Sequence, residues 1–137
     1  EYGYISDDEF GKYPFKNFSS EQYCVKAAPQ AIPLKHSDEI STGDRIFEVI
    51  HLPGHSRGAI ALYDKKRNHL FSGDVVYDGN LLDSLPGSSI KDYVNSMNIL
   101  LNLHPIKLFP GHLQPFDVTK MHHIAQYYID KNIQQIN

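Results

Sequence analysis

The sequence contains no tryptophan and only one cysteine, Cys24. A single cysteine cannot form an internal disulfide, which excludes a disulfide-stabilised secreted scaffold and favours a reducing compartment. No apolar run approaches the roughly 18 residues that a membrane-spanning helix requires. We therefore expect a cytoplasmic protein with no transmembrane segment, and peripheral association with a membrane is left open.

An excess of positive charge is also missing. The formal net charge is −3, with 13 Lys and Arg against 16 Asp and Glu, so nucleic acid is not an expected partner. Hydrophobic residues make up 41% of the chain and charged residues 21%, which is typical of a globular protein. The 137 residues are enough for one domain and too few for two.

The predicted elements begin after an irregular, aromatic-rich segment, residues 1–36, which has room for a short helix near 19–25. Alternating apolar residues then predict strands over 45–51, 59–63 and 69–72, which would form an antiparallel meander. A helix follows, capped by Ser88 or Ser89, then a strand over 106–109 and a final helix over about 118–133.

This order predicts an α/β fold in which each helix covers one face of a sheet. A sheet of about four strands with an open edge is incomplete and should expose apolar surface. The chain also begins with Glu1 rather than Met. We therefore expect residues 1–137 to be a single-domain fragment, with the other half of the fold elsewhere.

Three short motifs combine a predicted strand, a glycine and a side chain that can bind a metal. Glycine lets the backbone turn sharply and approach an ion closely, and His and Asp are suitable ligands for zinc or iron. Wide gaps between the motifs suit ligands from successive strand ends rather than a zinc finger. The motifs are Gly54-His55, Gly73-Asp74 and Gly111-His112.

Each motif taken alone also has a simpler explanation. A Gly-His pair in a loop is usually an ordinary turn, and Gly-Asp after a strand is often a turn or a cap. Three such motifs in series raise the case for a metal site, but the residue types alone leave both interpretations open.

The longer strings HLPGHSRG (51–58), LFSGD (70–74) and LFPGH (108–112) resemble, in order and spacing, the C-terminal motifs of the metallo-β-lactamase superfamily. The resemblance extends from about Glu39 to Lys131. After the Gly-His the family usually has Thr or Ser, Pro, Gly, Ser, whereas this chain has SRGA at 56–59. The stretch 54–86 most resembles a eukaryotic subgroup, the metallo-β-lactamase domain-containing protein two group.

The resemblance implies a fold and a metal site. The fold would be half of a four-layer αβ/βα sandwich with two zinc ions in the complete protein, iron or manganese being alternatives. His55 would bind the first metal, Asp74 would bridge both and act in catalysis, and His112 would bind the second. The family's other ligands form a His-x-His-x-Asp-His motif that this sequence does not contain. We therefore expect weak or no stoichiometric metal binding by the isolated chain.

Five further histidines are expected to be structural or solvated rather than ligands: His36, His69, His104, His122 and His123.

The subgroup implies hydrolysis of small-molecule thioesters such as acyl-CoA once the missing N-terminal half is present, with the isolated chain inactive. Candidate substrate-binding residues are Arg57, Tyr77 and Asp78, although each can equally serve the loop that holds it. The alternatives are a glyoxalase-II-like hydrolase of glutathione thioesters, an iron-dependent oxidoreductase on the same fold, and an inactive fragment. A homodimer is a further open alternative.

Overall fold

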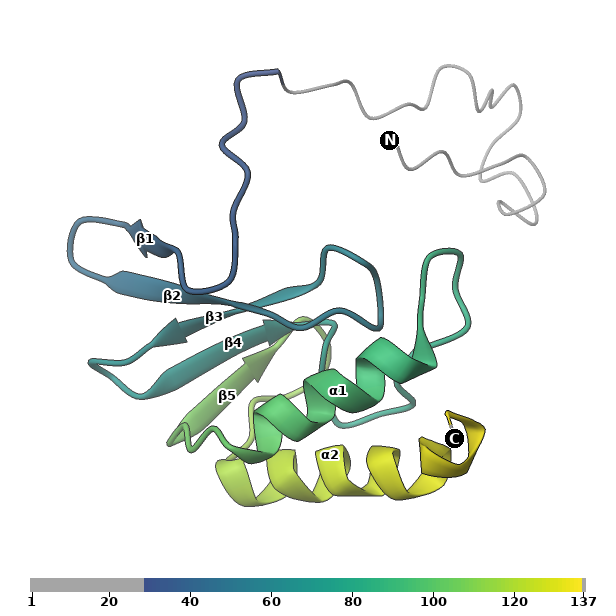
Figure 1. Ribbon diagram of the computed structural model, residues 1–137. Helices are drawn as coiled ribbons and strands as arrows, with labels where there is room; N and C mark the ends of the chain where they lie inside the picture. The colour runs from purple at the N-terminus through teal and green to yellow at the C-terminus, as the bar shows by residue number, and fades with distance from the viewer. Residues whose placement is uncertain (1–28, 137) are drawn as a thin grey trace, which may run out of the picture. The chain divides into compact units, whose positions relative to one another are not determined.

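The computed structural model describes residues 29–136, and the fold below is that of its compact unit, Leu34–Asn137. The unit has the α/β order predicted from the sequence. Its elements are β1 (Glu39–Ser41), β2 (Ile46–His51), β3 (Ile60–Asp64), β4 (His69–Gly73), α1 (Ile90–Leu101), β5 (Lys107–Pro110), α2 (Val118–Asn132) and the short 3₁₀ helix η3 (Ile133–Gln135) (Figure 1).

The strands form one sheet in the order β1-β2-β3-β4-β5. The first four are antiparallel neighbours, which confirms the predicted meander, whereas β5 lies parallel to β4 with Leu70 opposite Leu108. The strands β2, β4 and β5 therefore run in the same direction. Their C-terminal ends lie at one edge of the sheet, and the three Gly-containing motifs follow these ends.

The prediction of about four strands is wrong, because the described residues contain five. The additional strand is β1, which pairs with β2 through Ile40 opposite Phe47. It has three residues and only Ile40 is apolar, so it is too short for an alternating pattern to develop.

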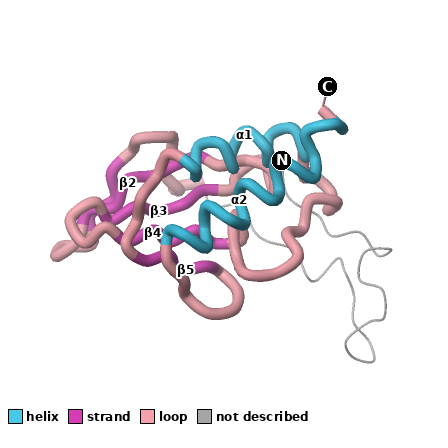
Figure 2. The backbone as a smooth tube through the Cα atoms, turned by 90° about the horizontal axis from the view of Figure 1, so that it is seen from below, coloured by secondary structure: helices cyan, strands magenta, loops and turns pink. Residues whose placement is uncertain are grey.

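Both helices pack on the same face of the sheet (Figures 1 and 2). The prediction that each helix covers a face of its own is therefore also wrong. They contact each other as well as the strands, and the rings of Tyr93 on α1 and Tyr128 on α2 lie 4.7 Å apart. The core between the helices and the sheet includes Leu70, Leu108 and Met97, all fully buried. Burial on this face stabilises the fold by roughly 25 cal/mol per Å² of apolar surface.

Each helix begins at a side-chain cap. Ser89 Oγ accepts a hydrogen bond from the Asp92 amide at 3.2 Å, as predicted for the start of α1. Asp117 Oδ1 accepts from the Lys120 amide at 2.9 Å at the start of α2. Such caps satisfy amides that have no partner within the helix.

The opposite face of the sheet carries a row of aromatic rings. Phe71 of β4 lies between Phe47 of β2 and Phe109 of β5, with ring centroids 5.7 and 4.9 Å away. Lys107 Nζ lies 5.7 Å from the centre of the Phe109 ring. These partly buried rings form an apolar strip on the side that faces away from α1 and α2.

In the described part of the chain, no helix is long and apolar enough to cross a membrane. Residues 1–28, Cys24 and the short helix expected near 19–25 lie outside the described residues. The interpretation of 1–36 as an irregular segment therefore stays a prediction.

Candidate metal centre

The structure brings together the three residues that the motifs single out. His55 follows β2, Asp74 follows β4, and His112 follows β5, at the shared edge of the sheet. Asp74 lies between the histidines, with Oδ2 at 3.8 Å from His55 Nε2 and Oδ1 at 3.3 Å from His112 Nε2. Their assignment as metal ligands stays a prediction at this point.

A hydrogen bond at Nδ1 fixes the orientation of the His55 ring. Nδ1 lies 3.1 Å from the carbonyl oxygen of Leu82, which can only accept a hydrogen bond, so Nδ1 carries the proton. In the neutral ring Nε2 then has a free lone pair, and this atom faces Asp74. The backbone is held as well, because Ser88 Oγ donates to the His55 carbonyl at 2.7 Å. Histidines that bind metals commonly show this arrangement of an outer hydrogen bond.

The backbone after β4 is anchored to α1 through Tyr93. Its hydroxyl hydrogen is shared between two carbonyl oxygens, that of Val75 at 2.8 Å and that of Asp74 at 3.2 Å. Burial raises the pKa of Tyr93, and nearby tyrosine and carboxylate charges raise it further. The hydroxyl therefore remains a donor at all ordinary pH values, while the Asp74 side chain stays 40% exposed.

Two glycines permit the close approach of these loops. A Cβ on Gly54 would lie 2.4 Å from Tyr93 Cα, and the φ of Gly54 is +147°, which favours glycine. A Cβ on Gly111 would lie 2.3 Å from Asp74 Oδ1. The Gly111 amide donates to the Gly73 carbonyl at 2.8 Å, which joins two of the motifs directly.

His112 is the most open of the three residues, with 63% of its side chain exposed. Tyr77 approaches it edge-on at 5.6 Å between ring centroids and donates its hydroxyl to the Asn80 carbonyl at 2.7 Å. The next residue, Leu113, has a φ of +64°, which is unusual for leucine. Backbone strain of this kind is frequent at functional sites.

The donor set fits metal ions of the zinc and iron type. Two imidazole nitrogens and a carboxylate are suitable ligands for these metals, and a carboxylate has two oxygens with which to bridge. Within residues 29–136, however, no three His, Cys, Asp or Glu side chains converge into a complete metal-binding cluster. The three residues are arranged as two pairs that share Asp74.

The three candidate substrate residues differ in their surroundings. Arg57 is exposed, and its carbonyl accepts a hydrogen bond from His51 Nε2 at 2.9 Å. Tyr77 is buried beside His112, whereas the carboxylate of Asp78 forms an ion pair with Lys120 at the start of α2. Their role in binding substrate stays a prediction.

Three of the remaining histidines pack against other parts of the fold. His122 Nε2 donates to the Leu103 carbonyl at 2.8 Å, and its ring meets that of His104 edge-on at 5.3 Å. His69 packs against Phe109. Sequence reasoning missed the contribution of Leu82 to the site, because a backbone carbonyl carries no signal in the residue type.

The sequence profile described as the metallo-beta-lactamase superfamily matches residues 2–112. The chain belongs to this superfamily. It is also 42% identical, over 132 residues, to the protein from Homo sapiens named acyl-coenzyme A thioesterase MBLAC2; the match covers 93% of this chain and 47% of that protein. The chain thus spans about half the length of this relative.

Solved structures share the fold. The metallo-beta-lactamase family protein TTHA1429 from Thermus thermophilus has a TM-score of 0.72 at 19% identity, covering 88% of this chain and 41% of that one. TTHA1623, solved in a di-iron-bound form, has a TM-score of 0.64 at 30% identity, covering 76% of this chain and 52% of that one. The α/β fold is therefore that of the superfamily.

Proposed function

We propose that the chain contributes one half of the active site of a metal-dependent hydrolase that cleaves thioesters such as acyl-CoA. The observation that carries the proposal is the convergence of two histidines on one carboxylate. His55 Nε2 and His112 Nε2 face the two oxygens of Asp74, at 3.8 and 3.3 Å. The thioesterase name of the 42% identical human relative supports the choice of substrate class.

Each residue would have a distinct task. His55, Asp74 and His112 would hold the metal ions, zinc being the proposed metal, and Asp74 would be shared between the two ions. When bound, such ions lower the pKa of water to about 7 and polarise a carbonyl oxygen. Tyr93 holds the Asp74 backbone, and Leu82 holds the His55 ring. Arg57 and Tyr77 are proposed to contact the substrate, as is Asp78.

The further ligands would come from outside residues 1–137, since the sequence has no His-x-His-x-Asp-His motif. We propose that the other half of the fold supplies them, and a second copy of the chain is the alternative source. A cytoplasmic location is part of the proposal. The isolated chain would then bind metal weakly and be inactive.

Metal content is the first test. Plasma emission spectrometry would compare the 137-residue chain with a protein that joins it to the remaining half of the fold. We expect about two zinc ions in the larger protein and essentially none in the chain. Two tightly bound metals in the chain alone would contradict the proposed division of ligands, and light scattering would then show whether a dimer supplies them.

Substrate class is the second test. The zinc-loaded larger protein should hydrolyse a long-chain acyl-CoA faster than a glutathione thioester, measured by release of free thiol. The reverse preference would favour a glyoxalase-II-like activity. The di-iron form of TTHA1623 keeps iron as the second candidate metal. Iron in the purified protein, together with absent hydrolysis of both thioesters, would favour the oxidoreductase. If the larger protein contains no metal and cleaves neither thioester, the remaining alternative, an inactive fragment, would be favoured.

A further inference from the structure

The loop 79–84 links His55 to helix α2. The carbonyl of Leu82 accepts the hydrogen bond from His55 Nδ1 at 3.1 Å. The adjacent residue, Asp83, points the other way and accepts a hydrogen bond on Oδ2 from the Tyr128 hydroxyl at 2.8 Å. The Leu82 carbonyl therefore has its partner in the candidate site, and the side chain of the next residue, Asp83, has its partner on α2.

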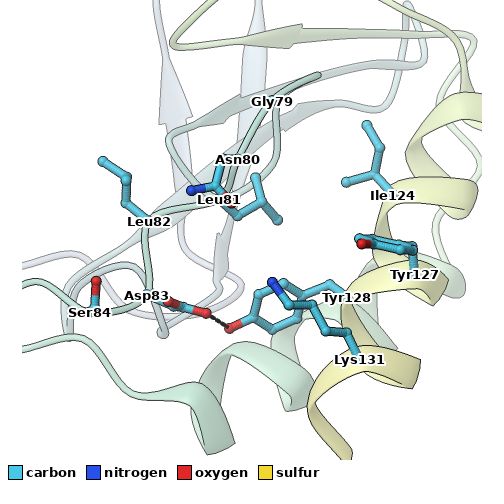
Figure 3. Close-up of a pocket in the computed structure, with 10 residues that line it drawn as sticks. All are labelled: Gly79, Asn80, Leu81, Leu82, Asp83, Ser84, Ile124, Tyr127, Tyr128 and Lys131. Carbon is cyan, nitrogen blue, oxygen red and sulfur yellow. Dashed lines mark hydrogen bonds between the residues drawn. The ribbon is translucent and has the colours of Figure 1, made fainter.

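A pocket of about 210 Å³ opens between the loop and α2 at this point. Figure 3 shows Asp83 and Tyr128 meeting at one side of the pocket, which Tyr127 and Lys131 of α2 also line. The pocket separates part of the loop from α2. The hydrogen bond from Tyr128 to Asp83 connects the two across its edge.

Two further contacts restrict the loop on the N-terminal side of Leu82. Tyr77 donates its hydroxyl to the Asn80 carbonyl at 2.7 Å, and the Leu81 side chain is 8% exposed within the core. On the C-terminal side, Tyr128 anchors Asp83 by its hydroxyl, and Ser88 Oγ and the Ser89 amide anchor the chain further on, at 2.7 and 2.8 Å from the carbonyls of His55 and Gly54. Removal of the Tyr128 hydroxyl would loosen the Leu82–Asp83 peptide, because the remaining anchors lie several residues apart, at Leu81 before it and at Ser88 after it.

We propose that Asp83 and Tyr128 are positioning residues that hold the Leu82 carbonyl against His55, and so keep the proton on Nδ1 and the lone pair of Nε2 directed at Asp74. Neither residue would touch a metal or a substrate. The significance for catalysis rests on the proposed function, whereas the effect on the ring is a property of this chain alone.

The hydrogen bond between Tyr128 and Asp83 should persist at all ordinary pH values. Burial raises the pKa of Tyr128, and the hydrogen bond and charge of Asp83 raise it further. The hydroxyl therefore stays protonated and able to donate. A hydrogen bond to a charged carboxylate is also stronger than one between neutral groups. In water, the neutral histidine side chain prefers the form with its proton on Nε2, so an acceptor at Nδ1 is needed to favour the other form at His55.

The test is the tautomer of His55, read from the ring ¹⁵N shifts of the labelled 137-residue chain. The pH is set well above the ordinary histidine pKa of about 6.5, so that the ring is neutral. Tyr128→Phe keeps the ring next to Tyr93 and removes only the hydroxyl. Tyr127→Phe is the matched control, because Tyr127 lines the same pocket but is 65% exposed.

We expect Tyr128→Phe and Asp83→Ala to shift His55 from the Nδ1–H form towards a mixture containing the Nε2–H form. Asp83→Asn, which keeps an acceptor for the Tyr128 hydroxyl, should retain most of the Nδ1–H form, and Tyr127→Phe should leave it unchanged. Thermal unfolding of each variant identifies any that fails to fold. A folded Tyr128→Phe or Asp83→Ala variant with an unchanged tautomer would overturn the proposal.

In the larger protein, loss of an outer partner of a ligating histidine typically reduces metal affinity about 10–100-fold. We expect a loss of that order in zinc affinity for Tyr128→Phe. If the tautomer shifts but the larger protein binds no metal and cleaves no thioester, the positioning role stands and the proposed function fails. If hydrolysis is observed and the tautomer does not shift, the proposed function stands and the positioning role fails.

Discussion

Two aspartates lie at opposite ends of β4, and their surroundings differ sharply. Asp64 ends β3 opposite His69 and is fully buried, whereas Asp74 follows Gly73 and is 40% exposed. Asp64 accepts hydrogen bonds from the amide and the guanidinium of Arg67, at 3.0 and 3.2 Å. Asp74 faces two histidines instead.

The difference distinguishes a structural carboxylate from a candidate ligand. The charge of Asp64 is balanced by Arg67 and by Arg45, whose Nε lies 3.9 Å away. Among the described residues, Asp74 forms no ion pair with an arginine or a lysine. A carboxylate that is open to solvent and flanked by imidazoles has the partners that a metal ion needs, whereas Asp64 already has its counter-charges.

The largest expected effect comes from Asp74→Asn. An amide cannot supply the charge that two cations require, so zinc affinity and kcat/KM of the larger protein should fall by more than about 100-fold, beyond the loss typical of an outer partner. Metal analysis and thiol-release kinetics measure this, and the melting temperature should change little. Retained zinc with full turnover would mean that Asp74 is no more functional than a surface residue.

Gly111→Ala should give the next largest effect. The new Cβ would meet Asp74 Oδ1 at 2.3 Å, and the mobile end of that side chain can move away. It would also lie 3.0 and 3.2 Å from the carbonyl carbon and oxygen of Gly73, which must shift slightly. We expect zinc affinity to fall by about 10–100-fold, comparable to loss of an outer partner. Because the backbone contacts with Gly73 are tight but not severe, stability should fall by about 1 kcal/mol, the lower end of the cost of overpacking. Isothermal titration and urea unfolding separate the two quantities.

Gly58→Ala is the control for Gly111→Ala, because a Cβ at Gly58 has no atom within 4 Å. Equal zinc affinities for the two variants would contradict the close packing of Gly111 against Asp74.

Asp64→Asn tests the other end of β4. Burial raises the pKa of Asp64, but the hydrogen bonds and charges of Arg67 and the charge of Arg45 outweigh it, so the folded pKa lies below its usual value. A depressed pKa contributes stability above the ordinary carboxyl pKa of about 3.9, and that contribution is lost as pH falls through the folded value. The substitution should lower the urea midpoint at neutral pH and leave zinc affinity in the larger protein unchanged.

The loss of folding stability in acid provides a second test of Asp64. The unsubstituted chain should lose more stability than Asp64→Asn when the pH falls below about 4. Equal losses in the two proteins would mean that the arginines do not stabilise the charged form of Asp64.

The smallest effect is expected for Lys120→Ala, which removes the exposed ion pair with Asp78. Exposed pairs contribute about 0–1 kcal/mol, so unfolding in urea should change little, and higher salt should reduce the difference further. A loss well above about 1 kcal/mol would show that this pair holds the loop after Asp74 more firmly than its exposure implies.

The spacing of apolar residues, together with turn and cap residues, predicted most of the fold. The helices α1 and α2 and the strands β2 to β5 are each long enough for such a spacing to be recognised. The short strand β1 is not, and nothing local indicated that both helices pack on one face. The three motif residues could be found from sequence because glycine and ligand types recur at strand ends. The Leu82 carbonyl and the Tyr128 hydroxyl could not, since their roles depend on contacts between distant segments.

The parallel pairing of β4 with β5 has a consequence for how the chain folds. A parallel neighbour requires a crossover, and here the chain must pass through α1 before β5 can pair. Closing that long connection costs more chain entropy than closing the antiparallel hairpins before it, and distant contacts of this kind form slowly. We therefore expect the loops of His55 and Asp74 to meet first and His112 to arrive last. An ion present during folding would meet a two-donor site before the third donor is in place.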